Sequence, residues 1–79
     1  MSSRCGQRFL RREYVASRGG WAALVYDRGQ LDWEVDVINL SGEPKAVLFV
    51  PDERAARDAV RAVGAVYGCE FRELAARAR

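Results

Sequence analysis

Alternating carboxylates are the residues of this sequence that most suggest chemistry. Asp32, Glu34 and Asp36 occupy every second position of the segment 31–38, LDWEVDVI. Residues two apart on a β-strand lie on one face, about 6.5–7 Å from each other. This spacing is too wide for one Ca²⁺ or Mg²⁺ ion without further ligands, so no metal site is predicted. The row suits a basic protein partner, which would relieve the mutual repulsion; a solvated strand face is the alternative.

Two tyrosines are the aromatic candidates for the same surface. Tyr26 shares one strand face with Ala22 and Leu24, and Trp21, Ala23 and Val25 share the other. If the acids point outward, one of these two faces adjoins the acidic row, and the Tyr26 face is the candidate. A tyrosine beside carboxylates is typical of protein interfaces, and a half-buried sheet residue is the alternative. Tyr14 has the same two interpretations. The predicted partner-binding residues are therefore Tyr14, Tyr26, Asp32, Glu34 and Asp36.

A second, basic surface is predicted from arginines. The basic side chains are all arginine except Lys45, and arginine suits interfaces, although a GC-rich genome gives the same bias. The formal net charge of +2 is too even for a generic nucleic-acid-binding protein, so direct nucleic-acid binding is not favoured. The candidates are Arg8, Arg11 and Arg12 in a predicted strand, and Arg54, Arg57 and Arg61 on one helix face.

The sequence lacks the residues that several kinds of catalytic and ligand-binding sites require. The chain has no histidine, which excludes Ser-His and Cys-His nucleophilic pairs. Cys5 and Cys69 are too few and too far apart for a disulfide framework or, without histidine, a tetrahedral zinc site. No glycine-rich phosphate loop precedes a helix. We therefore expect no enzymatic activity, no metal and no cofactor.

Alternation and turn residues predict the strands that would carry these side chains. Turn signals fall at 18–20, 28–30 and 39–44. The four predicted strands between them span 7–17, 21–27, 31–38 and 45–50. Short connections between consecutive strands are typical of an antiparallel meander.

A helix is predicted after the last strand. Asp52 is its predicted N-cap and Gly68 its predicted C-cap, with an apolar stripe from Ala55 to Tyr67. The following tail predicts a short second helix that buries Phe71, Leu74 and Ala75. The fold class is therefore α+β, a four-stranded antiparallel sheet with the main helix and the short C-terminal helix packed on one face. The other face stays partly exposed.

The chain as a whole predicts one domain. Its 79 residues make a single α+β unit, 1–79, with residues 1–6 frayed at the terminus. No apolar run approaches the ~20 residues of a membrane helix, and the N-terminal segment lacks the apolar region of a secretory signal. We therefore expect no membrane partner and a reducing, cytoplasmic location.

The segment 22–60 combines several features in a fixed order. A strand ends in Val-Tyr-acid-x-Gly at 25–29, an acidic/valine strand follows, then a Ser-Gly-Glu turn at 41–43, an apolar strand and an acidic-capped helix. In this order the chain resembles a small anti-CRISPR protein that phages use against type I-F systems. The resemblance covers roughly half of the chain as a pattern and nearly all of it as an order of elements.

This resemblance implies an inhibitor that binds the crRNA-guided surveillance complex, Cascade, and blocks recognition of target DNA. In that family a sheet tyrosine and a strand acid contact the backbone subunits of the complex. The resemblance places the tyrosine at Tyr26, the acid at Asp36 if the hairpin is slipped by one residue, and a first-strand tyrosine at Tyr14. The arginine excess and the different helix leave type I-C and type I-F targets both open.

Physical reasoning leaves three functions open. The first is this inhibitor, because a surveillance complex is lined with basic residues that hold phosphates, where an acidic row would fit. The second is a small nucleic-acid-binding module that uses the arginine clusters. The third is a bacterial protein-interaction or dimerisation domain, a monomer or weak dimer that pairs through a free sheet edge.

Overall fold

The computed structural model describes residues 8–29 and 32–74. The predicted frayed segment 1–6 lies outside these residues. The elements, in chain order, are β1 (Phe9–Ala16), β2 (Trp21–Asp27), β3 (Trp33–Asn39), β4 (Pro44–Val50), α1 (Glu53–Tyr67) and β5 (Phe71–Glu73). The α+β class is thus confirmed, with five described strands in place of the four predicted.

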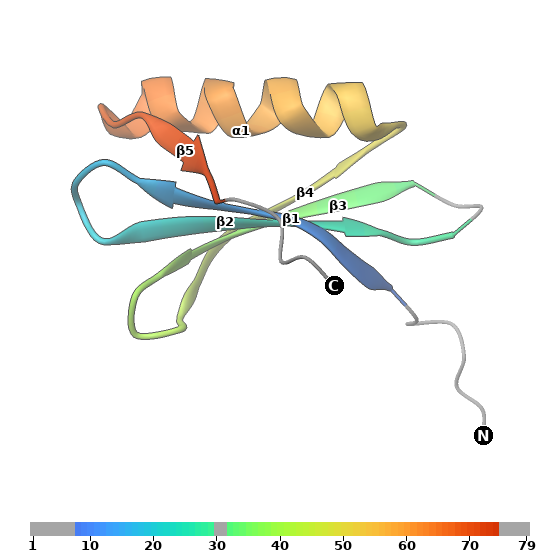
Figure 1. The fold of residues 1–79 in the computed structure, drawn as a ribbon, viewed down its shortest axis with the longest axis horizontal. Helices are drawn as coiled ribbons and strands as arrows, with labels where there is room; N and C mark the ends of the chain where they lie inside the picture. Colours follow the sequence, from blue (N-terminus) through green and yellow to red (C-terminus); the bar gives the residue numbers. More distant parts are fainter. Residues whose placement is uncertain (1–7, 30–31, 75–79) are drawn as a thin grey trace.

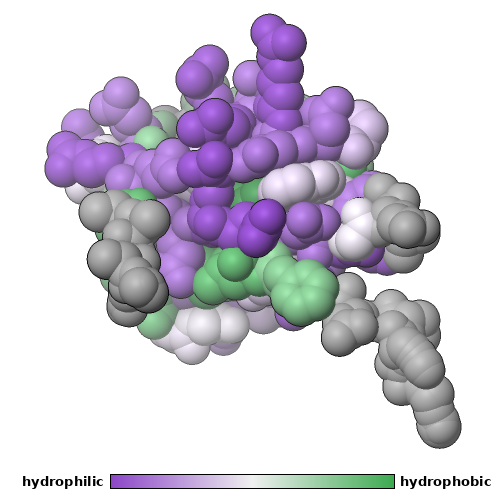
Figure 2. Space-filling view, turned by 45° about the vertical axis from the view of Figure 1, so that its right-hand side comes forward, coloured by the Kyte–Doolittle hydropathy of each residue, from purple (hydrophilic) through white to green (hydrophobic). Residues whose placement is uncertain are grey.

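The strands form one antiparallel sheet in the order β4-β3-β2-β1-β5. Strands β1 to β4 are the predicted meander. The helix α1 lies across one face of the sheet, as Figure 1 shows. Figure 2 shows hydrophilic side chains over the upper part of the molecule, where α1 lies, and hydrophobic side chains gathered below it.

The core lies between α1 and the sheet. Its sheet side is made of small and β-branched residues at alternate positions, which β2 and β3 contribute as Ala23, Val25, Val35 and Val37, all fully buried. The helix contributes Ala56 and Val60 from the predicted apolar stripe. Small residues on both sides allow the helix to lie close to the sheet.

The predicted caps of α1 are confirmed. The side chain of Asp52 accepts a hydrogen bond from the backbone N–H of Ala55 at 2.8 Å, which satisfies a donor that the first helical turn leaves free. At the other end Gly68 adopts a left-handed conformation with φ 71°, which a residue with a Cβ rarely adopts. This glycine turns the chain back towards the sheet.

The predicted C-terminal helix is wrong within the described residues. Phe71–Glu73 forms β5, which pairs with β1, and backbone hydrogen bonds from Ser17 to Glu70 and from Leu74 to Glu13 extend this pairing. Pairing satisfies backbone groups at an edge of β1 that would otherwise stay open. Phe71 packs against the core as predicted, but Leu74 is 44% exposed rather than buried. Ala75 lies outside the described residues.

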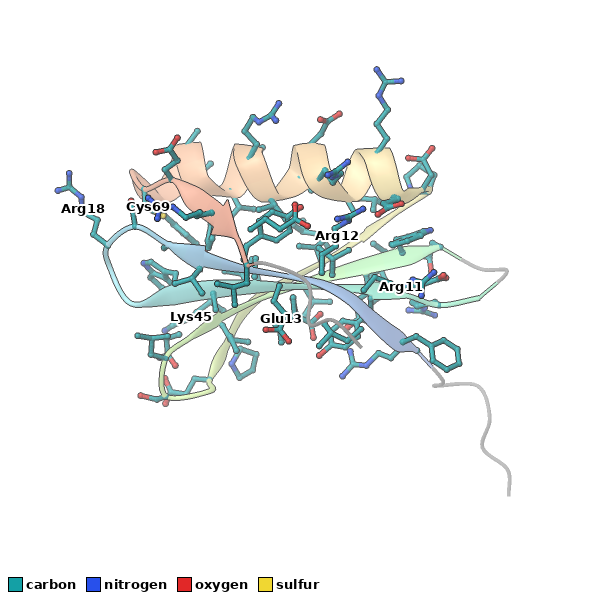
Figure 3. All side chains as sticks on the ribbon, viewed as in Figure 1. Arg11, Arg12, Glu13, Arg18, Lys45 and Cys69 are labelled. Atoms are coloured by element: carbon teal, nitrogen blue, oxygen red, sulfur yellow. The ribbon has the colours of Figure 1, made fainter. Side chains whose placement is uncertain are left out.

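A β-bulge in β1 changes which face its residues occupy. The pairing of β1 with β2 shifts between Leu10 and Arg12, so that Arg11 is the extra residue. After the bulge, Arg12 and Tyr14 lie on the side of α1, whereas Leu10 lies on the opposite side with Tyr26. Figure 3 shows Arg12 between the sheet and α1 and Glu13 on the far side of the sheet.

Candidate functional site

The face of the sheet opposite α1, called the open face from this point, carries alternate residues of β1 to β4. The pairing of the strands arranges them in rows across the sheet. One row consists of Leu10, Tyr26, Glu34 and Phe49, and the next consists of Glu13, Leu24, Asp36 and Val47. The predicted adjacency of Tyr26 and the acidic strand is therefore confirmed.

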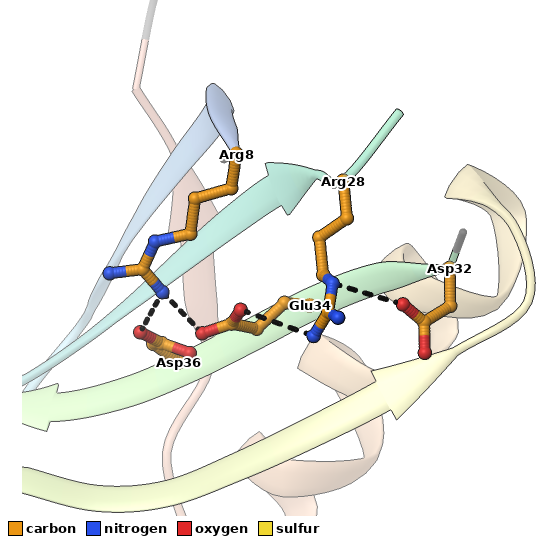
Figure 4. Close-up of polar contacts among 5 residues, drawn as sticks. All are labelled: Arg8, Arg28, Asp32, Glu34 and Asp36. Carbon is orange, nitrogen blue, oxygen red and sulfur yellow. Dashed lines mark hydrogen bonds and ion pairs between the residues drawn. The ribbon is translucent and has the colours of Figure 1, made fainter. Parts of the chain in front are cut away.

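Two arginines lie across the acidic part of the open face, as Figure 4 shows. Arg8 Nη1 donates hydrogen bonds to Glu34 Oε2 and to Asp36 Oδ2. Arg28 Nε lies 3.1 Å from Asp32 Oδ1, and Arg28 Nη1 lies 3.9 Å from Glu34 Oε1. Glu34 therefore interacts with both arginines and links them into one network.

Each of these arginines also covers an aromatic ring. The Arg8 guanidinium carbon lies 4.1 Å from the centre of the Tyr26 ring. The Arg28 guanidinium carbon lies 4.9 Å from the centre of the Phe49 ring. A guanidinium over a ring face is attracted by the ring quadrupole. The open face thus holds a guanidinium between carboxylates and an aromatic ring in two neighbouring places.

The solvated strand face, which was the alternative for the acidic row, is wrong for Glu34. Glu34 points away from α1 as predicted, but the residue is only 7% exposed because Arg8 and Arg28 lie over it. The Asp36 side chain is 16% exposed, and its Oδ1 atom is buried with no hydrogen-bond partner among the described residues. Asp32 precedes β3, and its side chain remains partly exposed.

Burial changes the acid–base properties of this network. Burial raises the pKa of Glu34 above its ordinary value, and the neighbouring Asp36 raises it further through a hydrogen bond and its charge, while Arg8 and Arg28 oppose the rise. Burial also raises the pKa of Tyr26; Arg8 opposes this, and the charges of Asp36 and Glu34 add to it. The Tyr26 hydroxyl is therefore a neutral hydrogen-bond donor at neutral pH.

A pH-dependent stability follows from Glu34. Because folding raises its pKa, the group favours the folded state at low pH, and this contribution is lost as the pH rises through the folded pKa. Glu34→Gln removes the titration. We expect the free energy of unfolding of the variant to rise relative to that of the unsubstituted protein over the pH range that begins near the ordinary glutamate pKa and extends up to the raised pKa of Glu34 in the folded protein. Urea denaturation across this range measures the difference; a flat or falling difference would contradict the assignment.

Tyr14 does not belong to the open face. The bulge after Leu10 places Tyr14 on the side of α1, where it is 7% exposed and belongs to the core. It lines a hollow between α1 and β5 whose rim carries charged side chains of both signs, among them Arg57 and Glu73. The structure therefore separates the two predicted tyrosines.

The predicted basic surface is likewise divided. Arg8 lies on the open face, whereas Arg12 forms 2.6 Å ion pairs with Glu53 of α1 and Glu73 of β5 on the covered side. These hydrogen bonds raise the pKa of Arg12, so the side chain clamps three elements together as a permanent cation. Arg11 lies 3.7 Å from Asp27. The three exposed arginines of α1 are Arg54, Arg57 and Arg61.

Sequence reasoning missed the apolar residues and the arginine cover of the open face. Val47 and Phe49 are 47% and 56% exposed beside the carboxylates. Their alternation in β4 was a usable signal, but the continuous apolar run concealed it. Arg28 was visible only as a turn residue, and its contacts with Asp32 and Glu34 depend on the geometry of the hairpin.

Comparisons with known proteins give no relative for this arrangement. Protein-family models, curated proteins and solved structures were compared with the chain, and none of the three gave a match. In the part of the chain that the structure describes, no helix has the length and apolar character to cross a membrane. Within 8–29 and 32–74, no three histidine, cysteine or acidic side chains are grouped to hold a metal ion.

Proposed function

We propose that this chain is an inhibitor that binds a type I CRISPR surveillance complex, Cascade, through its open face and blocks recognition of target DNA. The observation that carries the proposal is a sheet face that α1 leaves uncovered and on which Tyr26 adjoins Glu34 and Asp36. The resemblance of segment 22–60 to small anti-CRISPR proteins supplies the class of partner. The proposal includes an intracellular site of action in a bacterial host.

The composition of the open face supports docking of a protein. Leu10, Val47 and Phe49 are each about half exposed around the polar network. Interfaces combine apolar and aromatic side chains with a few polar groups that fix the orientation of the partner. Covering these side chains would stabilise a complex by roughly 25 cal/mol for each Å² of apolar surface removed from water.

The arginine network indicates what the partner would supply. Arg8 occupies Glu34 and Asp36 and lies over Tyr26, so the protein satisfies its own carboxylates when it is alone. An arginine of a basic partner would make the same contacts after Arg8 swings away. The buried Oδ1 of Asp36 could accept a further hydrogen bond from such a partner. Binding is then an exchange of one guanidinium for another.

Target-DNA binding by purified type I-C and type I-F complexes tests the proposal. We expect an excess of the protein to abolish DNA binding by at least one of the two complexes, because the inhibitor and the DNA phosphates use the same basic surface. The protein alone is titrated with the same DNA, since its exposed arginines would otherwise mimic inhibition by binding the DNA itself. Undiminished DNA binding by both complexes would contradict the proposed partner.

Arg8→Ala tests the exchange in the same assay. Removing the internal guanidinium frees Glu34 and Asp36, so we expect binding to the complex to become roughly tenfold tighter, about 1.4 kcal/mol. Arg11→Ala is the matched control, because its side chain is 57% exposed and lies 3.7 Å from Asp27; its affinity should stay within about twofold. Weaker binding by the Arg8 variant would mean that Arg8 itself contacts the partner.

A further inference from the structure

The sheet has two edges of different character. β4 pairs with β3 on one side, and in the described part of the chain no strand pairs with its other side. β5 at the opposite edge has three residues, of which Arg72 and Glu73 are charged. Natural sheets protect their edges with short strands and charged residues. β5 has both of these features.

β4 has neither feature along most of its length. It spans seven residues, and its only charged residue is Lys45 at the second position. Proline has no backbone N–H, but Pro44 is the first residue of the strand, so the backbone N–H groups of the residues that follow are all present. The segment Ala46–Val50 therefore presents an uncharged edge whose outward N–H and C=O groups have no described strand partner. Such an edge favours pairing with another strand.

We propose that two copies of this chain pair antiparallel through β4, about a two-fold axis near Leu48, and join their five-stranded sheets into one. An isologous interface brings the same residues of both copies together, so it must be self-compatible. The absence of charge from Ala46 to Val50 meets this requirement, because no like charges face each other. A charged edge would have excluded a second copy and favoured a partner of opposite charge.

The pairing also covers apolar surface. Around an axis at Leu48, Val47 of one copy lies opposite Phe49 of the other on the open face. Both side chains are about half exposed in the single copy. Cross-strand pairs of an aromatic and a β-branched residue are favourable, which adds to the ladder of about one hydrogen bond per residue pair. This proposal does not depend on the CRISPR complex as a partner.

Sedimentation equilibrium of the full chain tests the proposal, under reducing conditions so that cysteines cannot bridge two copies. We expect a reversible dimer with a dissociation constant of roughly 100 μM. Val47→Lys places a charge at the paired edge and should weaken dimerisation at least about tenfold. Within the single copy the new lysine would stand beside Asp36, the residue paired with Val47, so we expect the variant to fold. Val66→Lys is the matched control, because Val66 is 78% exposed on α1; its dimerisation should stay within about twofold.

Amide hydrogen exchange distinguishes the edge from other contacts. We expect the amides of β4 to become more protected as the protein concentration rises, and the Val47→Lys variant to lose this dependence. A protein that remains monomeric at about 1 mM would overturn the proposal. A dimer that both lysine variants weaken equally would do the same. A dimer whose β4 amides gain no protection would place the contact elsewhere and also overturn it.

Discussion

Replacing Gly64 by alanine is expected to lower the free energy of unfolding by about 1–3 kcal/mol. Gly64 is a buried residue of α1, at the point where the chain returns beneath the helix towards β5. A Cβ at this position would lie 2.8 Å from the backbone oxygen of Cys69 and 3.2 Å from the Phe71 ring. Backbone cannot move aside as easily as a flexible side chain, so β5 or the helix must shift.

Helix propensity predicts the opposite sign, which makes the experiment decisive. Alanine in place of glycine in a helix interior normally stabilises by about 1 kcal/mol. Ala62→Gly is the control, because Ala62 is an exposed residue of the same helix; it should cost about 1 kcal/mol through propensity alone. Urea denaturation of both variants measures the two effects. A Gly64→Ala variant more stable than the unsubstituted protein would contradict the close approach of the return segment.

Local sequence signals were sufficient to predict the strands and the helix whose ends are marked by turn or capping residues. β2 begins and ends where the glycine turn before Trp21 and the hairpin after Asp27 predicted it. The helix begins after Asp52 and ends before Gly68, because an N-cap side chain and a left-handed glycine are encoded by single residues. The strong alternation of β3 also fixed which of its residues face α1.

The end of the chain could not be predicted in the same way. Residues 69–74 have no strand alternation, and their alanine-rich continuation favours a helix. β5 forms because β1 offers an unpaired edge and because Gly64 leaves room for the returning chain. Both causes are contacts with residues distant in the sequence. Propensity is a weak guide wherever such contacts decide the structure.

The candidate site was predicted in part for a similar reason. Tyr26 lies beside Glu34 because a tight hairpin sets the register between β2 and β3. Tyr14 lies on the other side because one extra residue, Arg11, reverses the alternation of β1. No residue near Arg11 is of a type, such as glycine, that predicts a β-bulge. The cover that Arg8 provides for the carboxylates depends on a pairing across three strands.

Tyr26 is expected to be the residue whose loss weakens partner binding most. Its ring adjoins Glu34 and lies beneath the Arg8 guanidinium at the centre of the open face. Central tyrosines that pack against charged groups often cost at least 2 kcal/mol when truncated, about thirtyfold in affinity. Tyr26→Ala removes the ring and the hydroxyl donor together. The Arg8 guanidinium and the neighbouring carboxylates then lose the aromatic side chain beside them.

Tyr67 provides the matched control on the opposite side of the molecule. It is 38% exposed, and its ring stacks on Trp21 with the ring centres 4.7 Å apart. Tyr67→Ala therefore removes the same side chain, also from a contact with a planar group, but at the end of α1 rather than on the open face. Thermal unfolding of both variants confirms that each remains folded at the temperature of the binding experiment.

Under the proposed function, the affinity of these two variants for the type I complex whose DNA binding the protein is expected to block tests most directly that the open face is the binding surface. Surface-immobilised complex and soluble protein give the three dissociation constants under identical salt. The open face as the binding surface predicts a loss of about thirtyfold for Tyr26→Ala and less than about threefold for Tyr67→Ala. Equal losses for the two variants, or unchanged affinity of the Tyr26 variant, would contradict it.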